Sequence, residues 1–399
     1  AAETGLPQAR LEGELTRTIN QVNLFVRLLR GTTWPKEIVD GHLRQSQLPL
    51  GPVAVFGAGN FPYAFSVAGN DTISALAAGC PVIYKSHPGH PLTSEWVAGI
   101  MDRAMLQAGM PEGTFAMLPD SSIESGKQLA AHPLIKAIGF TGSLKAGRAL
   151  FDIAAKRRNP IPVYAEMGSI NPVFILPGIL NEKGQEVAEK LAASNLLNAG
   201  QFCTNPGLII TLQSGDSETF HTHFAKQVKK AVAETMLSES IRQGFETALR
   251  QLVIGGADLV ACGMESPGSR QAIPYMFQTD GNTFLHQPLL QEEVFGPCSL
   301  HVVAESREEL LEIAASLEGQ LTASVWGNIT DKDLVDDLLP VLETKAGRLI
   351  YNQAPTGVEL SPAMMHGGPY PASTDSKFTS VGVGAIERWT RPVCYQNWE

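Results

Sequence analysis

The sequence predicts an α/β protein with two lobes, a Rossmann-type lobe built on a parallel sheet and a second α/β lobe. Two series of alternating strand-like and helix-like segments lead to this prediction, one over residues 53–155 and one over residues 172–350. Strands joined by helices form parallel sheets through right-handed crossovers, the architecture of nucleotide-binding lobes. The composition agrees: hydrophobic residues make up 44% and charged residues only 18% of the 399 residues, which indicates much buried surface.

Charge and cysteine content exclude several functional classes. The formal net charge is −10 and no basic tract is present, so we expect neither nucleic acid nor a membrane surface as a partner. No apolar run is long enough to span a bilayer and no signal-like segment opens the chain, so we expect a cytoplasmic protein. An odd number of cysteines without a CxxC pair indicates reduced thiols and no zinc or other metal site. The cysteines are Cys80, Cys203, Cys262, Cys298 and Cys394.

The first lobe begins with a predicted helix and continues as alternating strands and helices. Leu and Phe recur at helical spacing up to Arg30, and Gly31 to Pro35 ends that helix. Short apolar runs predict buried strands at 53–56, 81–85, 114–118 and 137–140, and helical spacing predicts helices at 72–79, 96–106 and 147–155.

The second lobe is predicted from a similar alternation. Strands are expected at 172–176 and 208–212, and helices at 186–199 and 220–236. The last thirty residues are rich in Gly, Pro and Ser, which is typical of an arm that lies over the body or over a partner.

Cys203 is a candidate nucleophile because it lies on a connection between a helix and a strand. Glycines flank this connection at 200 and 207, and polar neighbours such as Gln201 favour an exposed thiol. A lone cysteine is more often a small buried apolar residue, and a nucleophilic one needs a base or a positive environment.

Glu166 and Asn60 are candidates for acid–base and oxyanion roles. Glu166 follows apolar residues at the end of a strand, where burial would raise the pKa of its carboxyl toward that of a general base. A surface glutamate at a strand end fits the same pattern. Asn60 follows the first strand in a glycine-rich turn, where its amide can donate to an oxyanion, although asparagine is common in turns.

Two segments of the first lobe suit a nucleotide. Lys85 ends a strand, and ligands bind at the carboxyl ends of strands in open parallel sheets. An edge lysine that protects the sheet is the alternative. The glycine-rich segment 139–147 leads from a strand into a helix, which suits a phosphate, but it matches neither GxGxxG nor a P-loop.

Two further segments contain titratable groups. Residues 291–297 form a compact turn with two acids and an aromatic residue, which also fits an ordinary turn before a strand. His366 lies in a Gly-Pro loop, where an imidazole can titrate near neutral pH, although most such histidines are structural.

The order of these segments resembles that of the NAD(P)-dependent aldehyde dehydrogenase superfamily. The segments are Asn60-Phe-Pro, Lys85 after a strand, Phe140-Thr-Gly-Ser-x-x-x-Gly147, Glu166-Met-Gly-Ser, Gly200-Gln-x-Cys203 and Glu292-Glu-Val-Phe-Gly-Pro297. The likeness runs from about Glu3 to Trp398. The segments 51–58 and 366–374 look like the α-ketoglutarate semialdehyde (2,5-dioxopentanoate) dehydrogenase branch, with NADP-preferring fatty aldehyde dehydrogenases close by.

The resemblance implies a catalytic mechanism for an aldehyde substrate. Cys203 would attack the aldehyde to give a thiohemiacetal, and Asn60 with the Cys203 backbone amide would hold the oxyanion. Hydride transfer to the nicotinamide would leave a thioester, and Glu166 would activate the water that hydrolyses it. Two easier steps thus replace one difficult step. An aromatic residue often stands where this chain has His366, and this imidazole would act as the thiol base, orient the water, line a pocket or hold a carbonyl.

The resemblance also implies cofactor contacts. Lys85 would bind the adenosine ribose or its phosphate, Gly142 and Ser143 the pyrophosphate, and Glu293 the nicotinamide ribose, with Phe295 beside the nicotinamide. Many NAD-preferring relatives have a glutamate three residues after the lysine, where this chain has Pro88. Without that carboxylate a 2′-phosphate is not repelled, and Lys85, Ser86 and His87 would receive it. We therefore expect NADP to be accepted beside NAD.

Substrate recognition and domain organisation follow from the same resemblance. A keto-acid aldehyde needs a cation, and Arg27 and Arg30 on the early helix are candidates, with solvated helix arginines as the alternative. We expect a dinucleotide-binding lobe at 1–166 without its usual N-terminal part, and a catalytic lobe at 167–365. A C-terminal arm at 366–399 would complete the cleft and the contacts of a homodimer or homotetramer.

Three other functions remain open from the sequence. A fatty aldehyde dehydrogenase would prefer long aliphatic aldehydes. A catalytically silent protein of the same fold would be expected to lack Cys203 or Glu166, and both are present. A thiol esterase would turn over esters without a nicotinamide cofactor.

Overall fold

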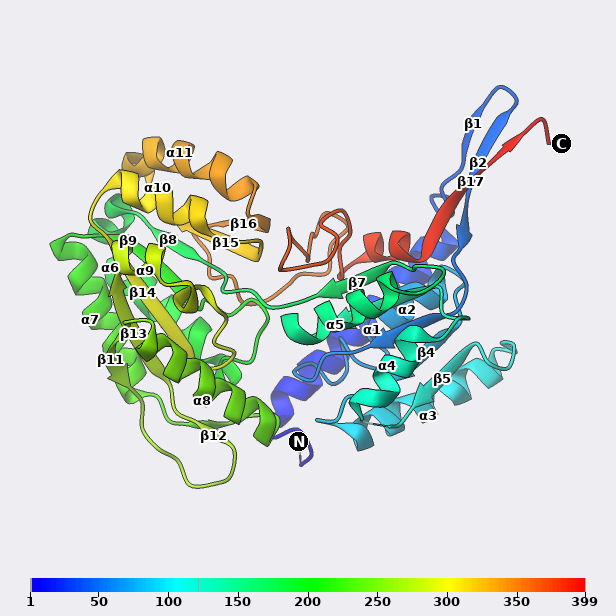
Figure 1. Cartoon of the computed structure of the whole chain (residues 1–399), viewed down its shortest axis with the longest axis horizontal. Coiled ribbons are helices and arrows are strands. Elements are labelled where there is room, and N and C mark those ends of the chain that lie inside the picture. The colour runs from blue at the N-terminus through cyan, green and yellow to red at the C-terminus, as the bar shows by residue number, and fades with distance from the viewer. Residues whose placement is uncertain (1, 121, 399) are drawn as a thin grey trace. The chain divides into compact units, whose positions relative to one another are not determined.

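The computed structural model describes residues 2–120 and 122–398, which form two compact units (Figure 1). The first unit comprises the residues up to Met167 together with 359–366 and the chain from Thr374 onward. The second unit comprises 168–358 and 367–373. The chain from residue 366 onward is thus divided between the units, in place of the single arm expected from the sequence.

The first unit contains a five-stranded, fully parallel sheet in the order β5-β4-β3-β6-β7. Its strands are β3 (Val53–Phe56), β4 (Val82–Lys85), β5 (Phe115–Leu118), β6 (Ala137–Thr141) and β7 (Val163–Glu166). The predicted strands therefore lie within a residue or two of their expected bounds. Their carboxyl ends share one edge of the sheet, so Lys85 and Glu166 both end strands there.

Helices cover both faces of this sheet because its side chains alternate between two apolar layers. Val53 and Val55 of β3 face one cluster, to which α1, α2, α3 and η4 contribute, whereas Ala54 and Phe56 face a second cluster with α4 and α5. The helices are α1 (Gln8–Arg30), α2 (Asn70–Ala77), α3 (Pro91–Gln107), α4 (Ile123–Ala131), α5 (Leu144–Ala155) and the 3₁₀ segment η4 (Val383–Trp389).

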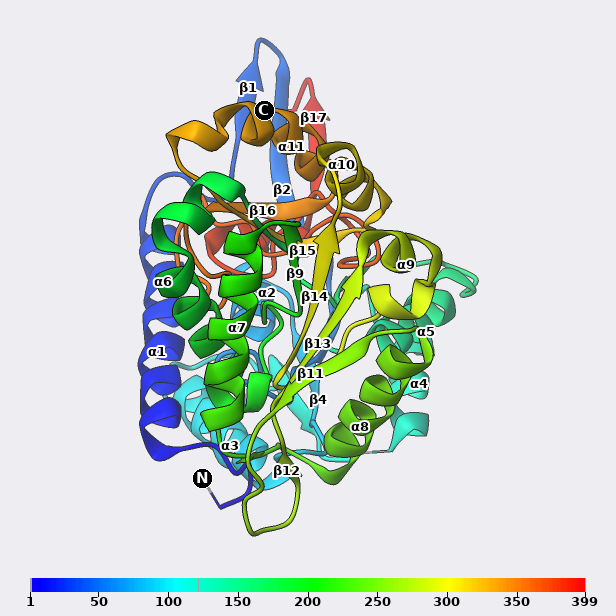
Figure 2. The same cartoon turned by 90° about the vertical axis from the view of Figure 1, so that its left-hand side faces the viewer.

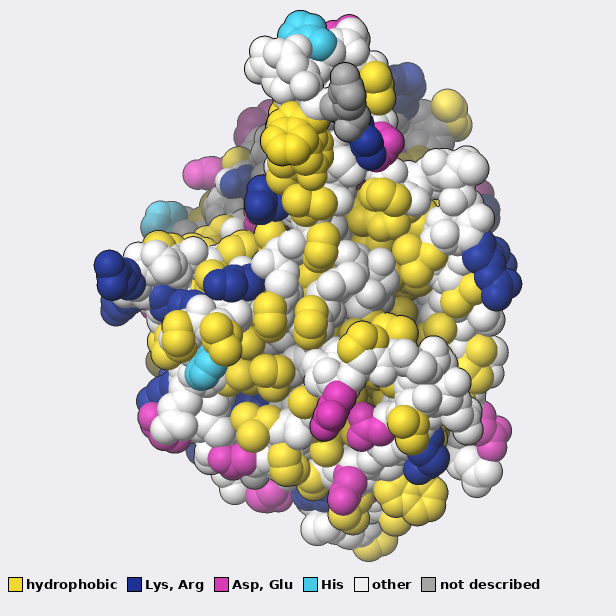
Figure 3. Space-filling view, turned by 90° about the vertical axis from the view of Figure 1, so that its right-hand side faces the viewer, with side chains coloured by type: hydrophobic (Ala, Val, Ile, Leu, Met, Phe, Trp, Pro, Cys, Tyr) yellow, Lys and Arg dark blue, Asp and Glu magenta, His cyan; other side chains and the backbone are white. Residues whose placement is uncertain are grey.

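A three-stranded antiparallel sheet extends from the first unit as an arm (Figure 1). Its strands are β1 (Ile38–Asp40), β2 (Leu43–Pro49) and β17 (Thr390–Gln396). The apolar side chains of Ile38 and Val39 are 62% and 68% exposed. Figure 3 shows this part of the molecule at the top of one face, with hydrophobic side chains on its surface.

The second unit contains a seven-stranded sheet in the order β11-β13-β14-β9-β8-β15-β16, parallel except for the edge strand β11. The strands are β8 (Val173–Ile175), β9 (Leu208–Leu212), β11 (Asp258–Cys262), β13 (Tyr275–Asp280), β14 (Cys298–Ala304), β15 (Gln320–Trp326) and β16 (Ala346–Tyr351). A separate pair consists of β10 (Glu234–Thr235) and β12 (Gln271–Ala272).

Helices again cover both faces of the sheet, α6 and α7 on one side and α8 to α11 on the other (Figure 2). They are α6 (Pro177–Leu196), α7 (Gly215–Lys230), α8 (Glu239–Ile254), α9 (Gly281–His286), α10 (Arg307–Ser316) and α11 (Lys332–Glu343). Short 3₁₀ segments are η1 (Leu197–Gly200), η2 (Pro288–Gln291) and η3 (Ile329–Asp331). Among the described residues, no helix is both long enough and apolar enough to cross a membrane.

Some predicted helix bounds are wrong in the second unit. The helix expected at 220–236 ends at Lys230, and residues 234–235 pair as β10 instead. The helix expected to reach residue 199 ends at Leu196, because Asn198, Ala199 and Gly200 all have positive φ, of 51°, 53° and 62°. Left-handed residues cannot continue a right-handed helix, so the chain turns there toward Cys203.

Candidate active site

Glu166 is the last residue of β7 and lies buried in the first unit, with 4% of its surface exposed. Its Oε1 lies 3.1 Å from Nε2 of the fully buried His366, and its Oε2 accepts a hydrogen bond from the Ser380 hydroxyl. The Ser380 backbone N–H in turn donates to the His366 carbonyl at 2.8 Å. We call these three residues the carboxylate cluster. Two separate C-terminal segments thus hold both carboxylate oxygens of one strand-end glutamate.

The position of this cluster depends on contacts between the C-terminal segments and the rest of the first unit. The Thr374 hydroxyl accepts a hydrogen bond from the Ala165 backbone N–H at 2.9 Å. The same hydroxyl donates a hydrogen bond to the Val163 carbonyl. Further along, Arg388 pairs with Asp71 of α2 at 2.6 Å. These contacts attach the C-terminal chain to β7 and to α2, so that Ser380 reaches Glu166.

The expected rise of the Glu166 pKa is wrong. Burial alone raises the pKa of this carboxyl, but the charge and hydrogen bond of His366, the Ser380 hydroxyl and the charge of Arg388 together outweigh burial. The pKa is therefore lowered and Glu166 is ionised at neutral pH. No local pattern indicates this lowering of the Glu166 pKa, because His366, Ser380 and Arg388 lie far from Glu166 along the chain.

Asn60 lies in the loop between β3 and α2, which the N-terminal half of α1 holds in place. The buried Glu14 accepts the backbone N–H groups of Tyr63 and Ala64 at 2.7 and 2.9 Å and pairs with Arg10 at 2.8 Å. The Arg10 guanidinium also lies 4.4 Å from the centre of the Phe61 ring, next to Asn60. Neither Arg10 nor Glu14 was a candidate from the sequence, although their spacing of four residues places them on one helix face.

Arg27 and Arg30 lie exposed in the last turn of α1. At about 1.5 Å per residue, Arg27 is roughly 15 Å along the helix from Arg17, whose guanidinium lies 5.2 Å from the centre of the Phe65 ring. The arginines that contact the residues after Asn60 are therefore Arg10 and Arg17.

The expected nucleotide residues cluster at the carboxyl edge of the first sheet. Burial lowers the pKa of the Lys85 ammonium, and the nearby Asp120 carboxylate opposes this. Burial also lowers the pKa of His87 to about 3, so its imidazole is neutral, and Nδ1 accepts the Gly89 N–H at 3.0 Å. The Ser86 hydroxyl is buried without a hydrogen-bond partner among the described residues. An orphaned hydroxyl beside a buried ammonium suits a polar ligand such as a ribose or phosphate.

The glycine-rich segment after β6 leads into α5, which begins three residues earlier than predicted. Ser143 caps this helix by accepting the Ala146 N–H at 3.4 Å, and the Gly142 N–H donates to the Glu166 carbonyl at 3.1 Å. A Cβ at Gly147 would lie 2.7 Å from the Met167 sulfur, so only glycine allows this close packing. The helix N-terminus adjoins the backbone of β7 and remains suited to a phosphate.

Cys203 lies on the connection between η1 and β9 in the second unit, and its side chain is partly exposed. The buried Asn171 adopts φ 48° and donates from its amide to the carbonyls of Cys203 and Asn205, both at 2.9 Å. The Asn171 Oδ1 accepts hydrogen bonds from the hydroxyl groups of Ser169 and Thr322. A satisfied buried amide therefore fixes the backbone at the cysteine and two residues after it.

The cysteine loop also packs against the turn at 291–297. A Cβ at Gly200 would lie 2.2 Å from the Gly296 carbonyl oxygen, so glycine is required there by contact as well as by its positive φ. Asn205 donates to the same carbonyl at 3.1 Å. In the sequence, the cysteine loop and the turn at 291–297 were separate candidate segments. In the second unit the two segments are in contact.

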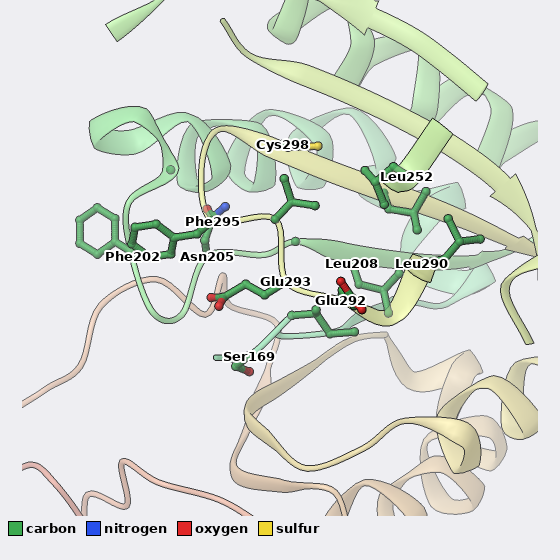
Figure 4. Close-up of a pocket in the computed structure, with 15 residues that line it drawn as sticks. Ser169, Phe202, Asn205, Leu208, Leu252, Leu290, Glu292, Glu293, Phe295 and Cys298 are labelled. Carbon is green, nitrogen blue, oxygen red and sulfur yellow. The ribbon is translucent and has the colours of Figure 1, made fainter. Parts of the chain in front are cut away.

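A pocket of the second unit lies between these loops (Figure 4). It is lined by Ser169, Phe202, Asn205, Glu293 and Phe295, among others. Burial raises the pKa of Glu293 to about 7, although the Ser169 backbone N–H stabilises its charge. The pocket thus contains a carboxyl that titrates near neutrality and two aromatic rings, and of these groups Glu293 and Phe295 were expected to contact a nicotinamide nucleotide.

Fold and site together define a class of protein. Sheets of mainly parallel strands with helices on both faces, and polar groups at the carboxyl ends of the strands, are typical of nucleotide-binding enzymes. The profile of the aldehyde dehydrogenase family matches residues 1–378, and the chain belongs to this family.

Individual relatives agree with this assignment. The chain is 46% identical over 413 residues to the alpha-ketoglutaric semialdehyde dehydrogenase of Acinetobacter baylyi, covering 100% of this chain and 78% of that protein. It is 45% identical over 408 residues to alpha-ketoglutaric semialdehyde dehydrogenase 2 of Azospirillum brasilense, covering 99% and 78%. The crystal structure of an NAD-dependent aldehyde dehydrogenase from Sinorhizobium meliloti superposes with a TM-score of 0.80 at 21% identity, covering 100% and 77%.

Proposed function

We propose that this chain oxidises α-ketoglutaric semialdehyde to 2-oxoglutarate with NAD or NADP. The family match establishes the enzyme class, and identities of 46% and 45% to two alpha-ketoglutaric semialdehyde dehydrogenases support this substrate over a long-chain aliphatic aldehyde. The observation on which the chemistry rests is the carboxylate cluster, because it provides an ionised, water-activating group in a buried position.

In this mechanism, the Cys203 thiolate attacks the aldehyde carbon and forms a C–S bond. Asn60 donates to the resulting oxyanion, together with the Cys203 backbone N–H. A bound nicotinamide nucleotide would supply the hydride acceptor that this oxidation needs, and with hydride lost from its carbon the adduct on Cys203 is a thioester. Glu166 then removes a proton from water, the hydroxide adds to the thioester, and the C–S bond breaks to release the acid and the thiolate.

The residues assigned to the cofactor fit its polar groups. Lys85, Ser86 and His87 would hold the adenosine ribose or its 2′-phosphate, and the N-terminus of α5 at Gly142 and Ser143 would hold the pyrophosphate. Glu293 would bind the nicotinamide ribose, with Phe295 beside the ring. Support comes from the orphaned Ser86 hydroxyl, the buried Lys85 and the pocket at Glu293.

The test of the proposed function is a set of initial rates measured at the absorbance of the reduced cofactor. NAD and NADP are each combined with α-ketoglutaric semialdehyde and with a long-chain aliphatic aldehyde. We expect kcat/KM to be at least about tenfold higher for the semialdehyde than for the aliphatic aldehyde. This ratio corresponds to a difference of about 1.4 kcal/mol in activation free energy. A preference for the aliphatic aldehyde would assign the chain to fatty aldehyde oxidation, and ester turnover without cofactor would favour a thiol esterase.

A substitution at Pro88 tests the basis of NADP use. Pro88 is exposed, so Pro88→Glu is expected to fold normally while placing a carboxylate near the site proposed for the 2′-phosphate. We expect kcat/KM for NADP to fall at least about tenfold, with little change for NAD. Pro88→Gln is the matched control without charge. An equal loss with both cofactors, or with both variants, would contradict the assignment.

A substitution at His366 tests its role as a partner of Glu166. Since His366 lowers the Glu166 pKa, His366→Phe is expected to raise it, so that Glu166 becomes protonated, and activity is lost, at a higher pH. The acidic limb of the kcat profile should therefore move toward neutral pH. His366→Gln, which keeps a hydrogen-bond donor, should move it less. If His366 serves as the thiol base instead, single-turnover acylation rather than thioester hydrolysis will be lost in both variants.

The proposal also covers the oligomeric state of the protein and its location in the cell. We propose a homodimer or homotetramer that assembles through the arm, and the exposed side chains of Ile38 and Val39 support this. Five cysteines without a disulfide agree with a cytoplasmic location. Ile38→Lys combined with Val39→Lys should reduce the mass measured by light scattering if the arm is the interface.

A further inference from the structure

One face of α1 combines charged and amide side chains beside the loop that contains Asn60. Arg10, Glu14, Arg17 and Gln21 recur at intervals of three or four residues and therefore share this face. Glu14 and Gln21 are buried, with 2% and 0% of their surfaces exposed. Arg10 is paired with Glu14, so its charge is compensated within the helix.

Arg17 lies near the carboxylate cluster. Its partly exposed guanidinium is 5.2 Å from the centre of the Phe65 ring, and that ring is 6.4 Å from the ring of His366. His366 contacts Glu166 directly. Two aromatic rings, those of Phe65 and His366, thus lie between the Arg17 guanidinium and the carboxylate that we propose to activate the hydrolytic water, all within the first unit.

Gln21 lies one helical turn beyond Arg17. Neither its amide oxygen nor its amide nitrogen has a hydrogen-bond partner among the described residues, although the side chain is fully buried. Buried amides are almost always hydrogen-bonded, so the Gln21 amide is suited to a polar group of a ligand. The amide nitrogen is a donor suited to a carbonyl oxygen.

We propose that Arg17 and Gln21 select the acid end of the substrate: Arg17 binds its carboxylate, and the Gln21 amide donates to its keto oxygen. A guanidinium forms two parallel hydrogen bonds to a carboxylate, which gives orientation as well as charge. This inference rests on the proposed function. The carboxylate and the keto oxygen that Arg17 and Gln21 would bind are present in α-ketoglutaric semialdehyde and absent from aliphatic aldehydes. The inference competes with the sequence-based assignment to Arg27 and Arg30.

Three aldehydes of equal chain length separate the contributions of the two residues. These are α-ketoglutaric semialdehyde, glutaric semialdehyde, which lacks the keto group, and pentanal, which also lacks the carboxylate. In Arg17→Met we expect kcat/KM to fall about 100-fold for both acids, mainly through KM, and to stay within about twofold for pentanal. In Gln21→Leu we expect about a tenfold fall for the keto acid alone. Arg103→Met, at an exposed position on α3, is the matched control.

The outcomes distinguish this inference from the proposed function. A wild-type enzyme that does not prefer the acids over pentanal overturns both. A wild-type preference that survives in Arg17→Met overturns the inference alone, as does an equal loss on pentanal, which would indicate a structural role. A loss confined to the acids in Arg27→Met or Arg30→Met, but not in Arg17→Met, assigns recognition to the end of α1 instead.

Discussion

Replacing Cys203 by alanine is expected to abolish aldehyde oxidation, with kcat/KM lowered by about 10⁴-fold or more. The reason is that no other group can form the thiohemiacetal, so the route through a thioester is lost entirely. Folding should be unaffected, because the cysteine is partly exposed and Asn171 holds its loop through backbone carbonyls. Initial rates and the thermal unfolding midpoint, measured on the same preparation, check both statements.

The matched control for this prediction is Cys262→Ala. Cys262 is an exposed thiol on β11 of the same unit and has no proposed role. Iodoacetamide should inactivate the wild type and the control at similar rates, and mass spectrometry should locate the inactivating label on Cys203. Turnover near the wild-type rate in Cys203→Ala, or inactivation by a label on Cys262, would remove Cys203 from the mechanism.

Replacing Glu166 by glutamine should lower steady-state kcat by about 10²- to 10⁴-fold, the usual effect of losing a general base. The amide fits the same space and keeps polar contacts to His366 and Ser380, but it cannot accept a proton. Acylation does not use this residue in the proposed mechanism, so a burst of reduced cofactor equal to the enzyme concentration should remain. Stopped-flow absorbance shows the burst, and the thioester should be detectable by mass spectrometry.

The same variant has an expected effect on stability with a defined pH dependence. The Glu166 pKa is lower in the folded than in the unfolded protein, where it is about 4.3, so its ionisation stabilises the fold above that pH. This contribution is lost as the pH falls through the folded pKa, and Glu166→Gln lacks it at every pH. The difference in unfolding free energy between wild type and variant should therefore shrink on acidification below about pH 4.

The exposed Glu124 of α4 provides the control, since Glu124→Gln should change neither the burst nor kcat. If Glu166→Gln loses the burst together with kcat, Glu166 acts before hydride transfer, for example in forming the thiolate. Unchanged kcat would exclude a role in catalysis altogether.

Local patterns in the sequence were enough to predict the parallel sheet of the first unit, and the ends of those strands for which bounds were predicted in either unit. The prediction that Lys85 ends a strand is correct, as is the prediction that Cys203 lies between a helix and a strand, because apolar runs and glycines report on the residues beside them. The ends of helices near Cys203 were predicted less well. Residues 198–200 all have positive φ, and Gly200 packs against the distant Gly296, a contact that no local pattern reveals.

By itself, then, the sequence determined the fold class, the strand ends that display the candidate residues, and the family. Only the tertiary structure decided the chemistry of Glu166 and the neighbours of Asn60. Burial alone predicted a raised pKa for Glu166, whereas His366 and Ser380 lower it. Likewise, the face of α1 that contacts the Asn60 loop bears Arg10 and Arg17, not Arg27. Electrostatic interactions depend on distance in space, and distances between residues far apart in the chain are set by packing rather than by local sequence.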